Sequence, residues 1–174
     1  KAIFEGQMEF LGKQKKVLPS KIRYGAMLEV PALAETLDVL LPKINFLSIG
    51  TNDLTQFLFA ADRADPRLAE RYDWLSPAIL RFIKRVINAT EGHDVDVAVC
   101  GEMGGRTLEA LALIGLGIRR LSITPAAVGP VKAMIRSTDH AAIKAKMDEL
   151  LTTPTVNIRE ALTAWASSQG IETG

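Results

Sequence analysis

Residues 46–53 read FLSIGTND, an apolar run that ends at Gly50 and is followed by three polar side chains. A short apolar run bounded by a glycine and polar turn residues is typical of a buried strand. A helical pattern then begins at Leu54. The stretch therefore predicts a strand, a polar turn and a helix, and in folds built from such units the chemistry lies in the turns at the C-terminal ends of the strands.

The same layout occurs three more times along the chain. The other predicted strands with their end turns cover residues 23–31, 95–102 and 120–125. Helical patterns separate the strands at residues 32–41, 77–89 and 108–115. We expect four βα units in series, with helical segments before the first and after the last. This alternation predicts an α/β fold with a parallel sheet and right-handed crossovers.

Four βα units are half of an eight-stranded barrel, which needs about 250 residues. The chain has 174 residues, and its first six look helical and lack an initiator Met. No signal peptide pattern is present at this end. We therefore expect a C-terminal fragment of a longer protein, with a free-standing doubly wound domain as the alternative. Residues 1–136 would hold the βα units, and residues 137–174 would form terminal helices at 141–151 and 158–168.

Composition limits the classes of function. A formal net charge of +1 provides no basic surface for nucleic acid. No apolar run reaches the roughly 18 residues that a membrane span requires. The single cysteine cannot form an internal disulfide, which suits a reducing cytoplasm. These features indicate an ordinary globular protein of the cytoplasm, without nucleic-acid or membrane partners.

Two carboxylates, Glu29 and Asp53, end successive predicted strands. Parallel strands would bring both to one edge of the sheet, where they would repel each other unless a divalent cation lay between them. Mg²⁺ is held by one or two carboxylates together with waters and phosphate oxygens. Asp53 has an alternative role as the N-cap of the following helix. Glu29 has an alternative as an exposed loop acid ahead of Pro31.

Asn52 and Arg63 are candidates for holding an anion. The Asn52 amide can donate to an anion or cap the helix. Arg63 lies beyond the helix, where its guanidinium could bind a phosphate through two hydrogen bonds. Alternatively, Arg63 pairs with Asp62 or Asp65.

Cys100 ends the third predicted strand, beside Gly101. A lone cysteine in an apolar strand is often a buried, unreactive packing residue. A nucleophilic thiol would need a histidine base, but His93 lies at the opposite end of the strand and His140 in a late helix. If Cys100 has a chemical role, proton transfer is favoured over covalent catalysis.

Four motifs occur in order, each at a predicted strand end or just beyond it: MLEVP at 27–31, SIGTNDLTQ at 48–56, AADR at 60–63 and CGEM at 100–103. Together they resemble the C-terminal half of the phosphoenolpyruvate-binding TIM barrel of Enzyme I of the phosphotransferase system, the phosphoenolpyruvate-protein phosphotransferases. Residues 61–63 and 121–123 look most similar to its nitrogen-related branch. Pyruvate phosphate dikinase and phosphoenolpyruvate synthase share this barrel and are the alternatives.

The resemblance implies roles for five residues. Glu29 and Asp53 would bind Mg²⁺, and Asn52, Asp53 and Arg63 would bind the substrate. Cys100 would donate a proton to the methylene carbon as pyruvate forms. The phosphoryl group would pass to a histidine on a separate N-terminal domain and then to an HPr-like carrier, so this chain alone would be inactive. The resemblance also implies a homodimer.

The chain departs from the family pattern at one place. The family usually continues CGEM with Ala-Gly-Asp, whereas this chain has Gly104, Gly105 and Arg106. A positive charge thus stands where an acid is usual, beside Cys100.

A different class of function, a non-catalytic module for dimerisation or regulation, is the alternative to an enzyme.

Overall fold

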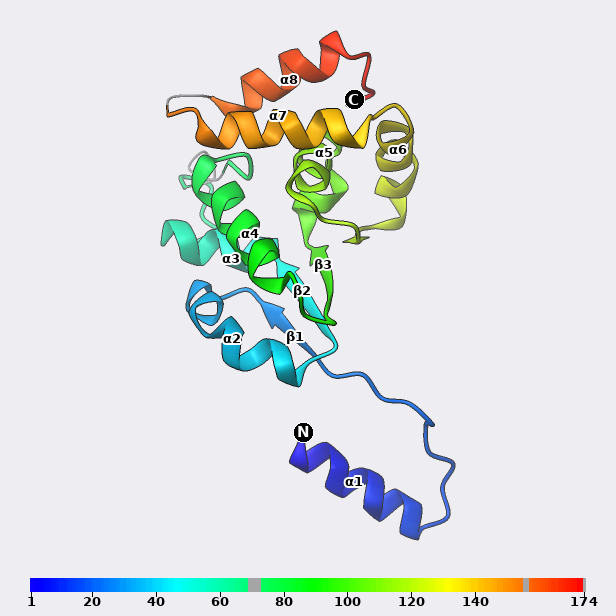
Figure 1. Ribbon diagram of the computed structural model, residues 1–174. Helices are drawn as coiled ribbons and strands as arrows, with labels where there is room; N and C mark the ends of the chain where they lie inside the picture. The colour runs from blue at the N-terminus through cyan, green and yellow to red at the C-terminus, as the bar shows by residue number, and fades with distance from the viewer. Residues whose placement is uncertain (69–72, 155–156, 174) are drawn as a thin grey trace.

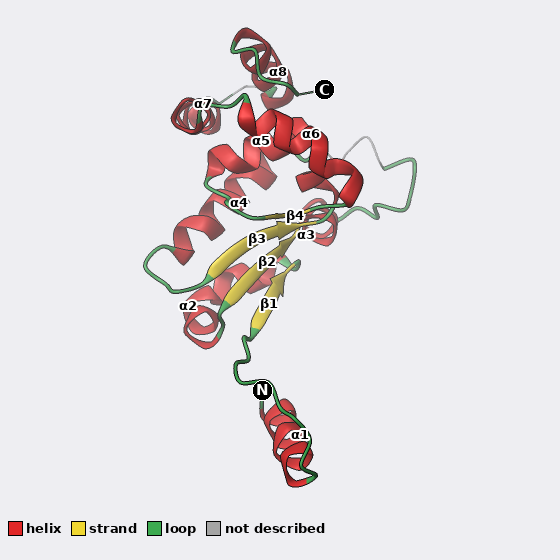
Figure 2. Cartoon of the chain, turned by 90° about the vertical axis from the view of Figure 1, so that its right-hand side faces the viewer, coloured by secondary structure: helices red, strands yellow, loops and turns green. Residues whose placement is uncertain are grey.

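The computed structural model describes residues 1–68, 73–154 and 157–173. Its centre is a parallel sheet in which every strand lies beside its neighbour in the chain, in the order β1-β2-β3-β4 (Figures 1 and 2). The strands are β1 (Gly25–Leu28), β2 (Phe46–Gly50), β3 (Asp96–Cys100) and β4 (Leu121–Ser122). The predicted α/β class and the parallel sheet are confirmed.

The two faces of the sheet differ in burial because side chains alternate along a strand. Leu47 and Ile49 of β2 point to the face that the helices cover, and both are fully buried. On the opposite face, Met27 is 51% exposed and Phe46 is 40% exposed. The chain therefore covers only one face of its sheet, and Figure 2 shows the helices gathered along that side.

Helices follow each strand, as the sequence predicts. The connecting helices are α3 (Thr51–Phe59), α4 (Pro77–Thr90), α5 (Thr107–Leu116) and α6 (Pro125–Arg136). The chain ends in α7 (His140–Thr152) and α8 (Ile158–Ser168). Helix α6 completes the fourth βα unit expected within residues 1–136, and Pro130 lies inside it although proline normally breaks a helix.

The helix predicted at residues 32–41 is only partly helical. The structure has a 3₁₀ turn, η1 (Pro31–Thr36), a single α-turn, α2 (Leu37–Leu40), and a second 3₁₀ turn, η2 (Leu41–Lys43). Pro42 lies just past α2 and donates no backbone hydrogen bond, so the α-helix cannot continue through it. The segment is helical where the apolar pattern predicts, but its first half is a 3₁₀ turn and only Leu37–Leu40 is an α-helix.

Helix α5 is the centre of the helical layer. Its residues are buried around most of its circumference, as expected for a helix in the interior of a protein. Helices α4, α6, α7 and α8 all pack against it. A charged cluster joins this layer to α8, because Arg159 pairs with the almost completely buried Glu109 at 2.7 Å and with Asp73 at 2.8 Å.

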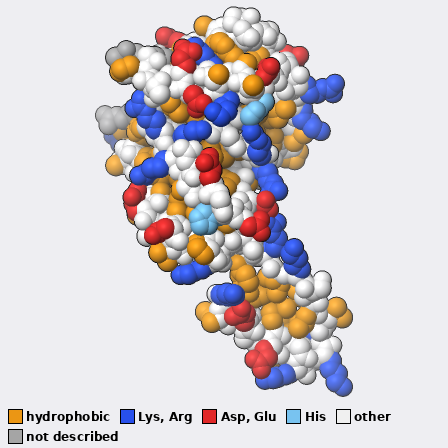
Figure 3. All heavy atoms as spheres, in the orientation of Figure 1, with side chains coloured by type: hydrophobic (Ala, Val, Ile, Leu, Met, Phe, Trp, Pro, Cys, Tyr) orange, Lys and Arg blue, Asp and Glu red, His pale blue; other side chains and the backbone are white. Residues whose placement is uncertain are grey.

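The N-terminal helix α1 (Ala2–Lys13) stands apart from the body of the molecule (Figure 1). None of its residues is buried, and Ile3 and Phe10 are 86% and 54% exposed. Phe4 packs edge-to-face on Tyr24, and the ammonium of Lys1, the N-cap residue, lies over the same ring. Figure 3 shows hydrophobic side chains gathered over this end of the molecule.

No helix in the described ranges combines the length and the apolar character needed to cross a membrane.

Candidate functional site

Three residues lie side by side at the C-terminal ends of the first three strands: Glu29, Gly50 and Cys100, here called the strand-end row. Gly50 pairs with Cys100 in the β2–β3 register. A side chain on Gly50 would meet the Glu29 carboxylate, because its Cβ would lie 3.3 Å from Glu29 Oε2. The absence of a side chain at Gly50 thus leaves room for the carboxylate on the uncovered face.

Cys100 is half-buried and hydrogen bonded from the neighbouring strand. The Ser48 hydroxyl donates to Cys100 Sγ at 3.2 Å, and Sγ lies 3.6 Å from the Ile49 carbonyl oxygen. No hydrogen bond connects Cys100 to either histidine, and both histidines are exposed. The site therefore offers Cys100 no histidine base.

The turn after β3 is held by the start of α3. Thr51 Oγ1 donates to the Cys100 carbonyl at 2.9 Å, and Asn52 Oδ1 accepts a hydrogen bond from the Glu102 backbone N–H at 3.1 Å. Gly101 between them has a φ of 104°, and a Cβ there would lie 2.5 Å from Thr51 Oγ1. Only glycine fits this turn, because it tolerates the positive φ and has no Cβ.

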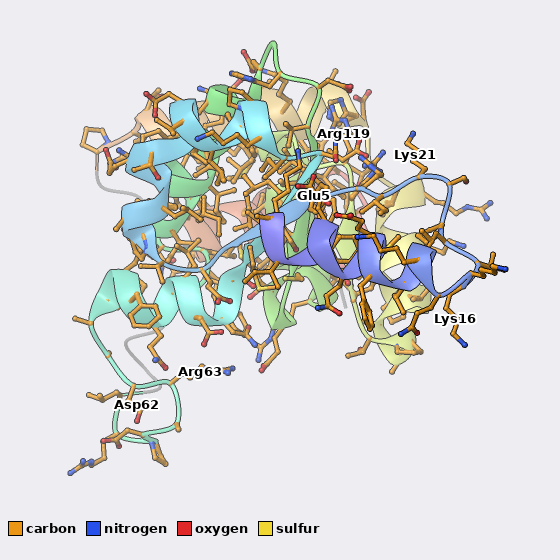
Figure 4. The ribbon with its side chains drawn as sticks, turned by 90° about the horizontal axis from the view of Figure 1, so that it is seen from below. Glu5, Lys16, Lys21, Asp62, Arg63 and Arg119 are labelled. Atoms are coloured by element: carbon orange, nitrogen blue, oxygen red, sulfur yellow. The ribbon has the colours of Figure 1, made fainter. Side chains whose placement is uncertain are left out.

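Asp53 and Arg63 form an ion pair, with Asp53 Oδ1 3.6 Å from Arg63 Nε. Asp53 is the third residue of α3, and the N-cap position is Gly50, so the N-cap alternative for Asp53 is wrong. The predicted alternative that Arg63 pairs with Asp62 or Asp65 is also wrong, since Asp65 binds Arg67. Figure 4 shows Asp62 and Arg63 on the loop after α3, which projects from the body.

Two adjoining cavities open beside these residues. One, of about 510 Å³, is lined by Cys100 and runs between the ends of β3 and β4. The other, of about 330 Å³, is lined by Arg63 and Thr55. Asn52, Glu102 and Arg106 line both cavities. The Thr55 hydroxyl is buried without a partner in the described structure, and such a group in a cavity wall is a place for a water or a ligand.

Arg106, the departure from the family pattern, is the N-cap residue of α5 and makes no capping bond. Its guanidinium stacks over the Trp74 ring, 4.7 Å from the centroid. It has no acidic partner within the described residues. A cation at the positive end of a helix is unfavourable, so the stacking on Trp74 offsets a local electrostatic cost.

The acidic residues suit a hard cation that brings other ligands with it. Within residues 1–68, 73–154 and 157–173, no three His, Cys, Asp or Glu side chains form a metal-holding group. A self-sufficient metal centre is thus not built into this part of the chain. Mg²⁺ needs only one or two carboxylates when waters and phosphate oxygens complete its shell. The carboxylates of Glu29 and Asp53 have the oxygen chemistry that this ion requires.

Sequence reasoning singled out Glu29, Asn52, Asp53, Arg63 and Cys100 but missed the residues that hold them and other residues that line the cavities. Ser48 and Thr51 were treated as parts of a strand and a turn, and their hydrogen bonds to Cys100 were not anticipated. One signal was available for Ser48: it lies two positions before Gly50, so it shares the face of the strand-end row. Ser48 and Cys100 are 52 residues apart in the sequence, and the register between β2 and β3 brings them together.

Comparison with known proteins matches residues 1–140 to the phosphoenolpyruvate-binding domain of phosphoenolpyruvate-utilising enzymes. A multiphosphoryl transfer protein of Xanthomonas campestris pv. campestris is 42% identical over 83% of this chain and 17% of its own length. A phosphoenolpyruvate-protein phosphotransferase of Haloferax volcanii is 40% identical over 80% of this chain and 25% of its own. One from Borreliella burgdorferi is 43% identical over 66% and 20%. The chain thus spans about a fifth of the length of these curated relatives.

Proposed function

We propose that this chain, which belongs to the family of phosphoenolpyruvate-utilising enzymes, carries half of the site at which phosphoenolpyruvate gives up its phosphoryl group and leaves as pyruvate. The acceptor would be a histidine of the same longer protein, outside this chain, and an HPr-like carrier would receive the group next. The observation that supports this most is the strand-end row, which sets a carboxylate and a thiol on one edge of a parallel sheet.

In this proposal Glu29 and Asp53 hold Mg²⁺. When bound, the ion would neutralise charge on the phosphoryl oxygens, which is the main requirement of phosphoryl transfer. Glu29 contributes a carboxylate whose position over Gly50 depends on the missing side chain there. Asp53 contributes from the first turn of α3, where the helix dipole favours a negative charge.

Asn52 and Arg63 hold the phosphate. Asn52 Oδ1 is occupied by the Glu102 backbone, whereas Nδ2 makes one long contact of 3.5 Å to Glu102 Oε1, so an amide proton is free to donate to an anion. Arg63 is bound to Asp53 only through a 3.6 Å pair in which both side chains are more than 40% exposed. Exposed pairs of this kind contribute about 0 to 1 kcal/mol. Arg63 can therefore turn to a phosphate at little cost.

Cys100 donates the proton that completes pyruvate. Loss of the phosphoryl group leaves an enolate, whose methylene carbon needs an acid close to one face. Cys100 is partly accessible, lines the larger cavity and has no histidine base. These features suit a proton donor better than a nucleophile.

The wider architecture is part of the proposal. Four parallel strands in sequential order match half of an eight-stranded barrel, and the uncovered face of the sheet is where a barrel would have its interior. A cytoplasmic location, a homodimer and membership of the nitrogen-related branch are proposed from the resemblance alone.

The test is Asp53→Ala in the full-length protein that contains this chain. Calorimetric titration with phosphoenolpyruvate should show Mg²⁺-dependent binding in the wild type and none in the variant, because a metal ligand is lost. Asp38→Ala, an exposed acid in α2, is the control and should leave binding unchanged. Undiminished Mg²⁺-dependent binding by Asp53→Ala would refute the metal assignment. A wild-type protein that binds the ligand but never forms pyruvate would favour a regulatory module.

A further inference from the structure

The hydroxyl of Ser48 is the one side-chain donor to Cys100 Sγ in the described structure. Ser48 lies on β2 opposite Ala98, and Gly50 lies opposite Cys100, so Ser48 is one step below the sulfur on the same face. The 3.2 Å separation is well within the range for a hydrogen bond to sulfur. Strand pairing fixes both backbones, which makes the contact a property of the sheet and independent of any mobile loop.

We propose that Ser48 is a positioning residue for Cys100 that stabilises the sulfur once its proton has left. This inference rests on the proposed proton transfer from Cys100. In that step the S–H bond breaks, a C–H bond forms at the methylene carbon of the enolate, and the electron pair stays on sulfur. The enolate oxygen becomes the ketone of pyruvate, and water later returns a proton to the sulfur.

The hydroxyl acts mainly after the proton has moved. Hydrogen bonds to an ionised acceptor are about twice as strong as those between neutral groups. The Ser48 contact is therefore weak while Cys100 is a thiol and strong when it is a thiolate. An interaction that strengthens along the reaction raises kcat, whereas one that is equal throughout changes only substrate binding. Ser48 should contribute to turnover and contribute nothing to phosphoenolpyruvate affinity.

The neighbouring groups support this division of roles. The Ile49 carbonyl, 3.6 Å from Sγ, is an acceptor and can only orient the neutral thiol. The Thr51 hydroxyl donates to the Cys100 carbonyl oxygen and makes no hydrogen bond to the sulfur. Ser122 pairs with Cys100 across β3 and β4, but its exposed hydroxyl makes no hydrogen bond to Sγ. Ser48 alone is placed to respond to the charge on sulfur in the described part of the chain.

The experiment compares Ser48→Ala and Ser48→Thr in the full-length protein. For Ser48→Ala, kcat for pyruvate formation should fall about 10- to 100-fold, the effect of losing a hydrogen bond to a charged group, with KM unchanged. Ser48→Thr keeps the hydroxyl and should recover most of the rate. A second readout is the rate at which iodoacetamide labels Cys100 at fixed neutral pH, followed by mass spectrometry of its peptide. Labelling proceeds through the thiolate and should be slower in Ser48→Ala.

The outcomes separate this inference from the proposed function. Ser122→Ala removes a neighbouring hydroxyl that does not touch Sγ, and labelling of Cys100 should keep its wild-type rate. If Ser48→Ala labels Cys100 at the wild-type rate and retains kcat, the positioning role is wrong. If labelling slows but neither Ser48→Ala nor Cys100→Ala changes pyruvate formation, the hydrogen bond is real and the proton-donor role of Cys100 is refuted. A rise in KM with unchanged kcat would assign Ser48 to substrate binding and would also overturn the inference.

Discussion

At the scale of single residues, the proposed proton-donor role of Cys100 can be separated from substrate binding. In the full-length protein, Cys100→Ala should slow pyruvate formation by about 10² to 10⁴, the usual effect of a lost general acid. Phosphoenolpyruvate binding should persist, because a thiol contributes little to holding a phosphate. Steady-state kinetics and calorimetry on the same variant measure both quantities. A wild-type rate would mean that Cys100 is only a packing residue.

A second residue-scale prediction concerns Asp96 at the opposite end of β3. Hydrogen bonds from Arg120 and then Arg23 lower the pKa of Asp96 to about 2. An aspartate in the unfolded chain has a pKa of about 3.9. The stability that ionised Asp96 gives the folded protein is therefore fully present above that pH and is lost as the pH falls through about 2.

Urea unfolding between pH 6 and pH 2 tests this linkage. Asp96→Asn should be less stable than the wild type near neutral pH, and the difference should shrink on acidification. Asp94→Asn, two residues away and exposed, should follow the wild-type profile at every pH. A gap between Asp96→Asn and the wild type that stays constant down to pH 2 would contradict the ionic role of Asp96.

Sequence patterns located the candidate residues but not their partners. Periodicity and turn chemistry placed Glu29, Asp53 and Cys100 at strand ends, because these signals are local. The Arg63–Asp53 pair was not predicted, since nearer acids stood on either side of Arg63 in the sequence. Hydrogen bonds such as Ser48 to Cys100 depend on strand register, which no local pattern specifies.

At the scale of elements, α8 is held by a cluster that spans three parts of the chain. Arg159 of α8 binds Glu109 of α5 and Asp73. Partial burial raises the pKa of Asp73, but hydrogen bonds from Arg159 and the Leu75 N–H outweigh it, so that pKa lies below its ordinary value. The pKa of Arg159 is raised, chiefly by its hydrogen bond to Asp73. Both charged forms are thus stabilised in the folded protein.

Removing Arg159 should weaken this attachment of α8. Arg159→Met leaves the buried Glu109 without its partner and should reduce the free energy of unfolding by about 2 kcal/mol. Breaking a fully buried pair costs about 3–5 kcal/mol, and the loss here should be smaller because Arg159 is partly exposed. Adding Glu109→Gln should restore part of the loss, since no buried charge then remains. Chemical denaturation of the single and double variants measures both free energies of unfolding. A double variant less stable than Arg159→Met would contradict this account.

Element boundaries were predicted well where one signal dominated. The helices predicted at 77–89 and 158–168 agree closely with α4 (Pro77–Thr90) and α8 (Ile158–Ser168). Polar N-cap residues, Ser76 and Asn157, mark where these two helices begin. The helix predicted at 32–41 was the exception, because its first half is a 3₁₀ turn and only Leu37–Leu40 is an α-helix. Apolar spacing does not distinguish a 3₁₀ turn from the first turns of an α-helix over so short a segment.

At the scale of the whole molecule, the uncovered sheet face and the apolar surface of α1 predict self-association. Unpaired strand edges and exposed apolar side chains favour contact with another chain. Sedimentation of the isolated 174-residue chain should reveal a dimer or a larger assembly. Met27→Lys, which places a charge on the uncovered face, should shift the distribution towards monomer. A folded monomer at high concentration would refute the prediction.

The sequential strand order also has a consequence for how the chain is made. Each strand pairs with the strand synthesised just before it. During translation, β1 has therefore left the ribosome before β2 does, and β2 before β3. No pairing within this sheet waits for a segment that is translated later than the next strand. The strands thus become available in the order in which they pair, and a slowdown in translation after any strand leaves its earlier partner already synthesised.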